Sequence, residues 1–186
     1  MLRLSHTKRI VLTALFTAII TVCTMVIQIP SPVSGYVNLG DVFVLFSAFT
    51  LGPIYGALAA GLGSALADVL TGYVIYAPGT LIIKAGMAVA AYFVFIGIKG
   101  VIKGRKYPSM LIAAIVAEVI MVAGYFLYAC FLMGEGLSAA ASIVGNLFQA
   151  LIGIVVGPLL VEVLMRFLPN ESKNKDGEKN INVDKD

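Results

Sequence analysis

The chain contains long, nearly uninterrupted apolar runs, and this feature restricts its possible folds more than any other. A membrane-spanning helix needs roughly 20 mainly apolar residues, and runs of this kind recur along the 186 residues. Because 60% of the residues are hydrophobic and only 12% are charged, a soluble domain of this size could not bury them all. The runs lack a period of two, so we expect helices rather than a β-barrel.

The runs predict an all-α integral membrane bundle of six transmembrane helices in one domain, residues 1–168. Proline, glycine and polar clusters separate the runs, and the predicted helices cover residues 10–28, 41–52, 54–70, 80–98, 108–133 and 139–167. We expect loops at 30–40 and 71–79, and a disordered cytoplasmic tail over the charged residues 169–186. Asp41 is expected to cap the second helix.

Basic residues predict the orientation in the membrane, because they concentrate in cytoplasmic loops. Arg3, Lys8 and Arg9 precede the first helix, four more basic residues separate the fourth helix from the fifth, and Arg166 ends the sixth. With six spans, all three places lie on one side. We therefore expect both termini in the cytoplasm, in a multi-pass protein of a prokaryotic plasma membrane.

Polar side chains within the predicted spans indicate a functional site, because a charged group is costly in lipid. They are Asp68, Lys84, Glu118, Asn146 and Gln149. Helix rise places most of them in the outer half, as it does Asp41, so we expect a polar cavity open to the exterior. A structural alternative stays open: Asp68 and Lys84 could form only an ion pair, and Glu118 could be bonded to neighbouring helices.

The sequence lacks the motifs of common enzymes and of nucleotide-binding loops. The two cysteines, Cys23 and Cys130, do not have the spacing of a metal site. We therefore expect no enzymatic activity, no metal and no cofactor. A structural membrane subunit and a small membrane enzyme acting on lipid are the alternative classes.

Four sequence blocks stand in a fixed order in the first half of the chain. They are GYVNLGD at 35–41, LGPIYGA at 51–57, GSALAD at 63–68 and YAPGTLIIK at 76–84. Together they resemble the substrate-binding (S) component of an energy-coupling factor (ECF) vitamin transporter, and the resemblance extends over residues 8–168. Within that group the chain is most similar to S components for pyridoxine or hydroxymethylpyrimidine, which are grouped with riboflavin-type S components.

The resemblance implies a subunit that binds a small water-soluble vitamin at the outer face of the membrane. It implies docking on a membrane T component that carries two ATPase subunits, and no nucleic-acid partner. Ala14 and Ala18 match the Ala-x-x-x-Ala patch that meets the T component in this family, since small residues let helices approach closely. Pyridoxine or hydroxymethylpyrimidine is the first expected substrate, and riboflavin, pantothenate or another vitamin is the alternative.

The expected ligand contacts combine the polar groups with tyrosines, whose rings can stack on a flat heterocycle. They are Asn38, Asp41, Asp68, Tyr73, Tyr76, Lys84, Glu118, Tyr125, Tyr128, Asn146 and Gln149.

Overall fold

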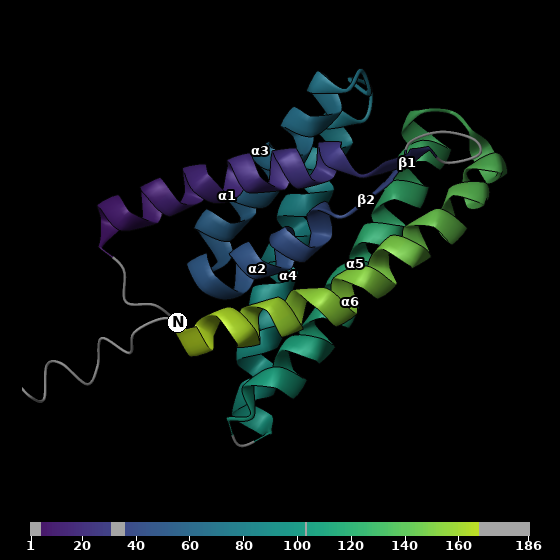
Figure 1. Cartoon of the computed structure of the whole chain (residues 1–186). Coiled ribbons are helices and arrows are strands. Elements are labelled where there is room, and N and C mark those ends of the chain that lie inside the picture. Colours follow the sequence, from purple (N-terminus) through teal and green to yellow (C-terminus); the bar gives the residue numbers. More distant parts are fainter. Residues whose placement is uncertain (1–4, 31–35, 103, 168–186) are drawn as a thin grey trace, which may run out of the picture.

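The computed structural model describes residues 5–30, 36–102 and 104–167, and it is an all-α bundle of six helices (Figure 1). The helices are α1 (His6–Val26), α2 (Gly40–Leu51), α3 (Pro53–Leu70), α4 (Ala77–Val101), α5 (Lys106–Leu127) and α6 (Ala141–Phe167). The predicted fold class is therefore confirmed. The segment 169–186, predicted as a disordered tail, lies outside the described residues.

Five of the six helices are long and apolar enough to cross a membrane, and α2 is the exception. With 12 residues, α2 is only about 18 Å long, whereas the hydrocarbon layer is about 30 Å thick. It packs against α1, α3, α4 and α6, and most of its side chains are buried. This short helix is thus the centre of the bundle and is enclosed by its neighbours.

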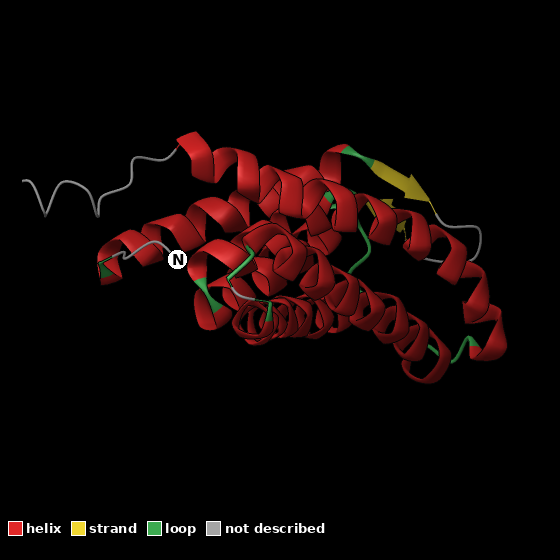
Figure 2. Cartoon of the chain, turned by 90° about the horizontal axis from the view of Figure 1, so that it is seen from below, coloured by secondary structure: helices red, strands yellow, loops and turns green. Residues whose placement is uncertain are grey.

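The connections differ from the predicted loops in two places. Within the predicted loop 30–40, residues Tyr36–Asn38 form strand β2, which pairs antiparallel with β1 (Gln28–Pro30). Figure 2 shows these strands at one corner of the bundle. The second difference is the start of α4 at Ala77, three residues earlier than predicted, because Pro78 fits the first turn of a helix, where no backbone N–H is needed.

Two short irregular helices connect α5 to α6. The π-helix η1 (Tyr128–Leu132) follows α5 directly, and the 3-10 helix η2 (Gly136–Ala140) precedes α6. A π-turn widens a helix locally and re-aims its side chains, and such turns often occur at functional sites.

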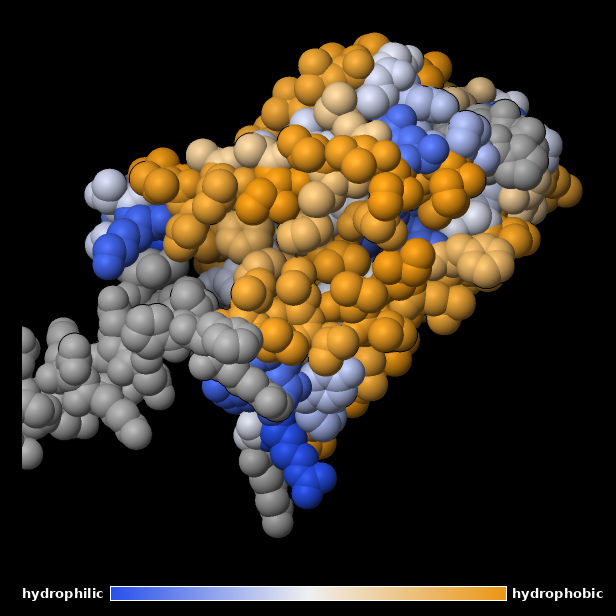
Figure 3. All heavy atoms as spheres, viewed as in Figure 1, coloured by the Kyte–Doolittle hydropathy of each residue, from blue (hydrophilic) through white to orange (hydrophobic). Residues whose placement is uncertain are grey.

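Different elements lie at the two ends of the bundle. In Figure 1 the start of α1, the end of α6 and the turn between α4 and α5 lie away from the β1–β2 hairpin. Figure 3 shows an apolar surface over most of the visible face, with hydrophilic residues at the start of α1 and near the α4–α5 turn. We refer to the end that carries the hairpin as the outer end, following the orientation that the basic residues predict.

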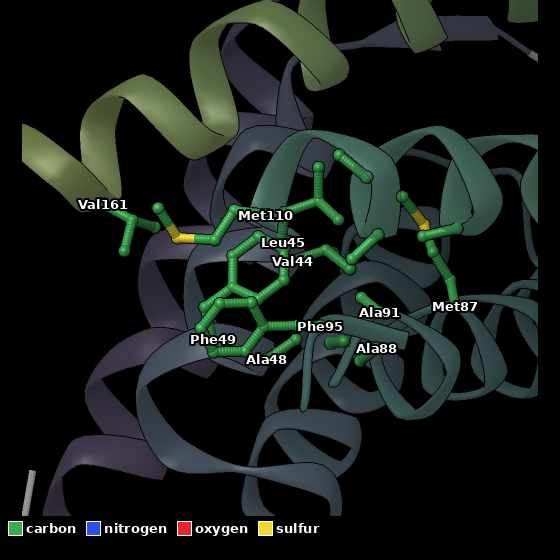
Figure 4. Packing of buried hydrophobic residues seen from close by; sticks show 14 of the residues in the cluster. Val44, Leu45, Ala48, Phe49, Met87, Ala88, Ala91, Phe95, Met110 and Val161 are labelled. Atoms are coloured by element: carbon green, nitrogen blue, oxygen red, sulfur yellow. The ribbon is translucent and has the colours of Figure 1, made fainter. Parts of the chain in front are cut away.

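The apolar core surrounds α2 and combines large phenylalanine and methionine side chains with many alanines. Figure 4 shows Leu45 and Phe49 of α2 beside Phe95 of α4, and the ring centroids of Phe49 and Phe95 are 5.4 Å apart. Buried alanines on α2, α3, α4 and α5 keep the helices close together. Without a hydrophobic driving force between helices in lipid, such close contact is what holds a membrane bundle together.

Gly63 is the point of closest approach between α1 and α3. A Cβ atom there would lie 2.8 Å from the Thr17 carbonyl oxygen and 2.9 Å from Cβ of Ile20. The Thr21 hydroxyl on α1 donates a hydrogen bond of 2.8 Å to the Gly63 carbonyl oxygen. The absence of a side chain at this position therefore permits a bond between helices that lie in contact.

We expect Gly63→Ala to destabilise the protein by about 1–3 kcal/mol, because the added methyl group forces α1 away from α3. The midpoint of thermal unfolding in detergent measures this effect. Gly86→Ala on α4 is the matched control, since a Cβ there meets nothing within 4 Å. Equal unfolding midpoints for the two variants would contradict the close-packing explanation.

Candidate functional site

A cavity of about 40 Å³ lies at the outer end of the bundle and is lined mainly by polar side chains. The hairpin strand β2 and the helices α1, α3, α4, α5 and α6 all contribute to it. Its lining consists of Thr24, Tyr36, Asn38, Ser64, Asp68, Tyr76, Thr80, Lys84, Tyr125, Ala129, Ser142, Asn146 and Gln149. Since one water needs about 10–15 Å³ by this measure, a ligand the size of a vitamin must displace some of these side chains.

A buried network of charge and amide groups forms the floor of this site. The Lys84 ammonium donates a hydrogen bond to Oδ1 of Asp41, and the two side chains are 2% and 1% exposed. Nε2 of Gln149 donates to Oδ2 of Asp41 at 2.5 Å, and Oε1 of Gln149 accepts from the Asn38 backbone N–H at 2.8 Å. The network ties α2, α4, α6 and β2 together.

The network corrects two sequence predictions. Asp41 does not cap α2: Leu39 is the N-cap residue and its side chain makes no capping bond, while the Asp41 carboxylate is occupied by Lys84 and Gln149. The pairing of Lys84 with Asp68 is also wrong. Although these two residues lie across one turn in sequence, the first turn of α2 enters the bundle and places Asp41 against Lys84 instead.

Asn38 bends the chain into α2. Its Oδ1 accepts a hydrogen bond of 2.8 Å from the backbone N–H of Gly40, which satisfies a donor at the start of the helix. Gly40 is required there, since a Cβ would lie 2.2 Å from Oγ1 of Thr24. Asn38 thus has a structural role at the start of α2, and its side chain also lines the cavity.

Asp68 lies on the opposite wall and bonds to the hairpin. The Tyr36 hydroxyl donates to Oδ1 of Asp68 at 2.5 Å, while Oδ2 has no hydrogen-bond partner among the described residues. Burial and the neighbouring Asp68 carboxylate raise the pKa of the Tyr36 phenol above its ordinary value, so this phenol keeps its proton and remains a donor.

Three of the four predicted tyrosines and Tyr36 form a row of rings beside the cavity. Ring centroids are 4.7 Å apart for Tyr36 and Tyr73, and 6.3 Å apart both for Tyr73 and Tyr76 and for Tyr76 and Tyr128. Tyr125 points its hydroxyl to Oγ1 of Thr80 at 3.1 Å. Among the predicted tyrosines, Tyr76 and Tyr125 line the cavity, whereas Tyr73 and Tyr128 do not.

Glu118 is close to the network but does not line the cavity. Its side chain is buried, and neither carboxyl oxygen has a hydrogen-bond partner among the described residues. A Cβ at Gly153 of α6 would lie 2.0 Å from Oε1 of Glu118 and 3.5 Å from Cβ of Asp41. Glu118 thus sits behind Asp41, where it also borders an apolar hollow of about 460 Å³ between α5 and α6.

The structure brings most of the predicted site residues together and adds several that the sequence did not single out. Asn38, Asp68, Tyr76, Lys84, Tyr125, Asn146 and Gln149 line one cavity. The additional polar groups are Thr24, Tyr36, Ser64, Thr80 and Ser142. Hydroxyl residues are common in membrane helices, where they bond to the preceding turn, so most of these groups could not be recognised from the sequence. Ser64 is the exception, because its spacing of four residues from Asp68 places both on one face of a helix.

A polar cavity inside an apolar helical bundle is the arrangement of a membrane protein that binds a polar solute. The family model described as "ECF-type riboflavin transporter, S component" matches residues 4–166. The chain therefore belongs to this family of ECF transporter S components, which are integral membrane proteins and binding subunits without enzymatic activity.

The proteins similar to this chain include one relative identified by sequence and one solved structure. A protein of Pyrococcus woesei, called an uncharacterized protein in a gap 3' region, is 37% identical over 154 residues, which is 79% of this chain and 95% of that protein. The solved structure described as "Structure and mechanism of the S component of a bacterial ECF transporter" has a TM-score of 0.71 at 22% identity. It covers 89% of this chain and 100% of its own, and it supports the fold alone.

We expect Lys84→Met to destabilise the protein by about 3–5 kcal/mol, because it leaves the Asp41 carboxylate buried without its cation. Thermal unfolding in detergent measures this loss. The double variant Lys84→Met with Asp41→Asn should recover most of it, since the charge is then removed together with its partner and the new amide still accepts from Gln149. A double variant less stable than Lys84→Met would argue against a buried ion pair.

Proposed function

We propose that this chain captures riboflavin at the outer face of the membrane and delivers it to an ECF module for ATP-driven uptake. Family membership supports the transporter class, and the description of the matching family supports riboflavin over pyridoxine or hydroxymethylpyrimidine. The observation that carries the proposal is the polar cavity at the outer end, with amide groups on one wall and tyrosine rings above it.

The chemistry of the lining suits a flavin. Riboflavin is an uncharged, flat, three-ring molecule with a pyrimidinedione edge and a hydroxylated chain. The Gln149 carboxamide is engaged by Asp41 and by the Asn38 backbone, but the carboxamide of Asn146 lines the cavity and offers both a donor and an acceptor, which can match the adjacent carbonyl and N–H groups of that edge. The rings of Tyr76 and Tyr125 provide faces for stacking.

The exposed surface of α1 is suited to the docking on a membrane T component that the family resemblance implies. Ala14 and Ala18 are exposed and one helical turn apart, and the larger apolar side chains of Val11, Leu15 and Val22 on the same helix are also exposed. Small residues between larger ones let a second helix approach closely in lipid. We propose that this surface docks on the membrane T component, which carries the two ATPase subunits.

We expect the purified full chain to bind riboflavin in preference to pyridoxine, hydroxymethylpyrimidine and pantothenate. Asn146→Leu should weaken binding about tenfold or more, because a buried hydrogen bond worth ~1.4 kcal/mol or more is lost. Equilibrium dialysis with labelled ligands measures both effects. Ser138→Ala is the control, since Ser138 is exposed outside the cavity. Tight binding of pyridoxine without binding of riboflavin would overturn the substrate assignment.

We expect the double variant Ala14→Leu and Ala18→Leu to lose docking on the T component while the isolated chain keeps its affinity for riboflavin. Co-purification with the T component and dialysis of the isolated chain measure the two properties. Gly97→Leu enlarges an exposed position on α4 where a Cβ meets nothing within 4 Å, so it controls for lipid-facing bulk. Normal co-purification of the double variant would rule out this docking surface.

A further inference from the structure

One wall of the cavity, formed by α1 and α3, carries polar atoms that the protein leaves without partners. Among the described residues, Oγ1 of Thr24, Oγ of Ser64 and Oδ2 of Asp68 are buried without a hydrogen-bond partner. All three residues line the cavity and are no more than 3% exposed. A buried polar group without a hydrogen-bond partner lowers the stability of the fold, so its presence in a native protein needs an explanation. Because these three groups line a cavity, hydrogen bonding to a bound ligand explains them.

The three atoms form a coherent patch. Ser64 and Asp68 are four residues apart on α3, so they face the same direction one turn apart. Thr24 lines the same cavity from the neighbouring helix α1, and its Oγ1 lies close to Gly40. Two hydroxyls can donate or accept, and the carboxylate oxygen can only accept while ionised. The patch therefore complements a ligand that presents several hydroxyl groups.

The charge balance around the patch is negative. Lys84 is the single cation that lines the cavity within the described part of the chain, and its ammonium is paired with Asp41. Asp68 forms no salt bridge among the described residues, although Thr80 and the Lys84 ammonium lie near enough to interact with its carboxylate. The Tyr36 hydroxyl donates to Oδ1, and Oδ2 has no hydrogen-bond partner among the described residues. Two carboxylates thus face one ammonium, and a ligand that brings further negative charge meets repulsion at Asp68.

We propose that Asp68 makes the site select the free, hydroxylated vitamin and reject its phosphate ester. The inference rests on the proposed vitamin-binding function. The Asp68 carboxylate accepts a hydrogen bond from a ligand hydroxyl, and Thr24 and Ser64 bond to neighbouring hydroxyls. A phosphate group in place of a hydroxyl puts its negative oxygens against the buried carboxylate, and Lys84, the one cation that lines the cavity in the described part of the chain, is already paired with Asp41. For riboflavin, the hydroxylated chain lies along the α1–α3 wall.

The test compares three flavins on the purified full chain: riboflavin, its phosphate ester flavin mononucleotide, and lumichrome, which has the rings without the hydroxylated chain. We expect the wild-type protein to bind riboflavin about 100-fold more tightly than flavin mononucleotide, and more tightly than lumichrome. Asp68→Asn keeps the size of the side chain and removes its charge. This variant should bind riboflavin several-fold more weakly and reduce the preference over flavin mononucleotide to about tenfold or less.

Ser64→Ala is the matched control on the same wall, because it removes a hydrogen bond and keeps the charge of Asp68. It should weaken riboflavin binding while the preference over flavin mononucleotide stays at the wild-type value. Unfolding midpoints check that each variant is folded. The wild-type comparison of the three flavins decides the proposal even where a variant fails to fold.

The outcomes separate this inference from the proposed function. Equal affinity of the wild-type protein for riboflavin and flavin mononucleotide, or an unchanged preference in Asp68→Asn, overturns the role of Asp68 and leaves riboflavin binding intact. Binding of pyridoxine without any flavin overturns the riboflavin assignment. In that case pyridoxine and its phosphate ester replace the flavins in the same comparison, and rejection of the ester by wild type but not by Asp68→Asn supports the inference. Failure to bind any vitamin overturns both.

Discussion

The ion pair between Asp41 and Lys84 is the interaction on which the site depends. A charge that leaves water for the interior of a helix bundle loses its hydration, and attraction to a partner offsets that loss only when the remaining hydrogen bonds are also made. Gln149 supplies the second bond to Asp41 and accepts one from the backbone of Asn38. The pair therefore fixes α2, α4, α6 and the hairpin strand β2 in one arrangement.

A second constraint is the length of α2. Because α2 is too short to cross the hydrocarbon layer alone, it begins inside the bundle, and Asp41 in its first turn lies at the level of the cavity. Longer helices enclose it on several sides, and they supply the apolar surface toward lipid. The space above the first turn of α2 is where polar groups can gather without facing lipid, which explains why the cavity lies at this end.

The arrangement of the polar groups divides the cavity into two walls with different chemistry. On the α4–α6 side, charge and amide groups satisfy one another and hold the helices in place. On the α1–α3 side, Thr24, Ser64 and Asp68 keep polar atoms unpaired. A protein designed only for stability would pair these atoms or replace them with apolar ones. Their presence distinguishes the α4–α6 wall, which holds the helices together, from the α1–α3 wall, which we propose contacts the solute.

The sequence alone determined that the chain lies in a membrane, how many helices it forms and which polar residues lie within them. The length of an apolar run and the presence of a charge within it can both be read directly along the chain. Only the tertiary structure decided which polar side chains bond to one another. Lys84 is closer in sequence to Asp68 than to Asp41, yet it bonds to Asp41. Glu118 lies next to the network but does not line the cavity. The hydroxyls of Thr24 and Ser64 could be recognised as part of the site only because the structure shows that they line the cavity. Pairing across helices depends on their depth and rotation in the bundle, which packing sets and which no local pattern encodes.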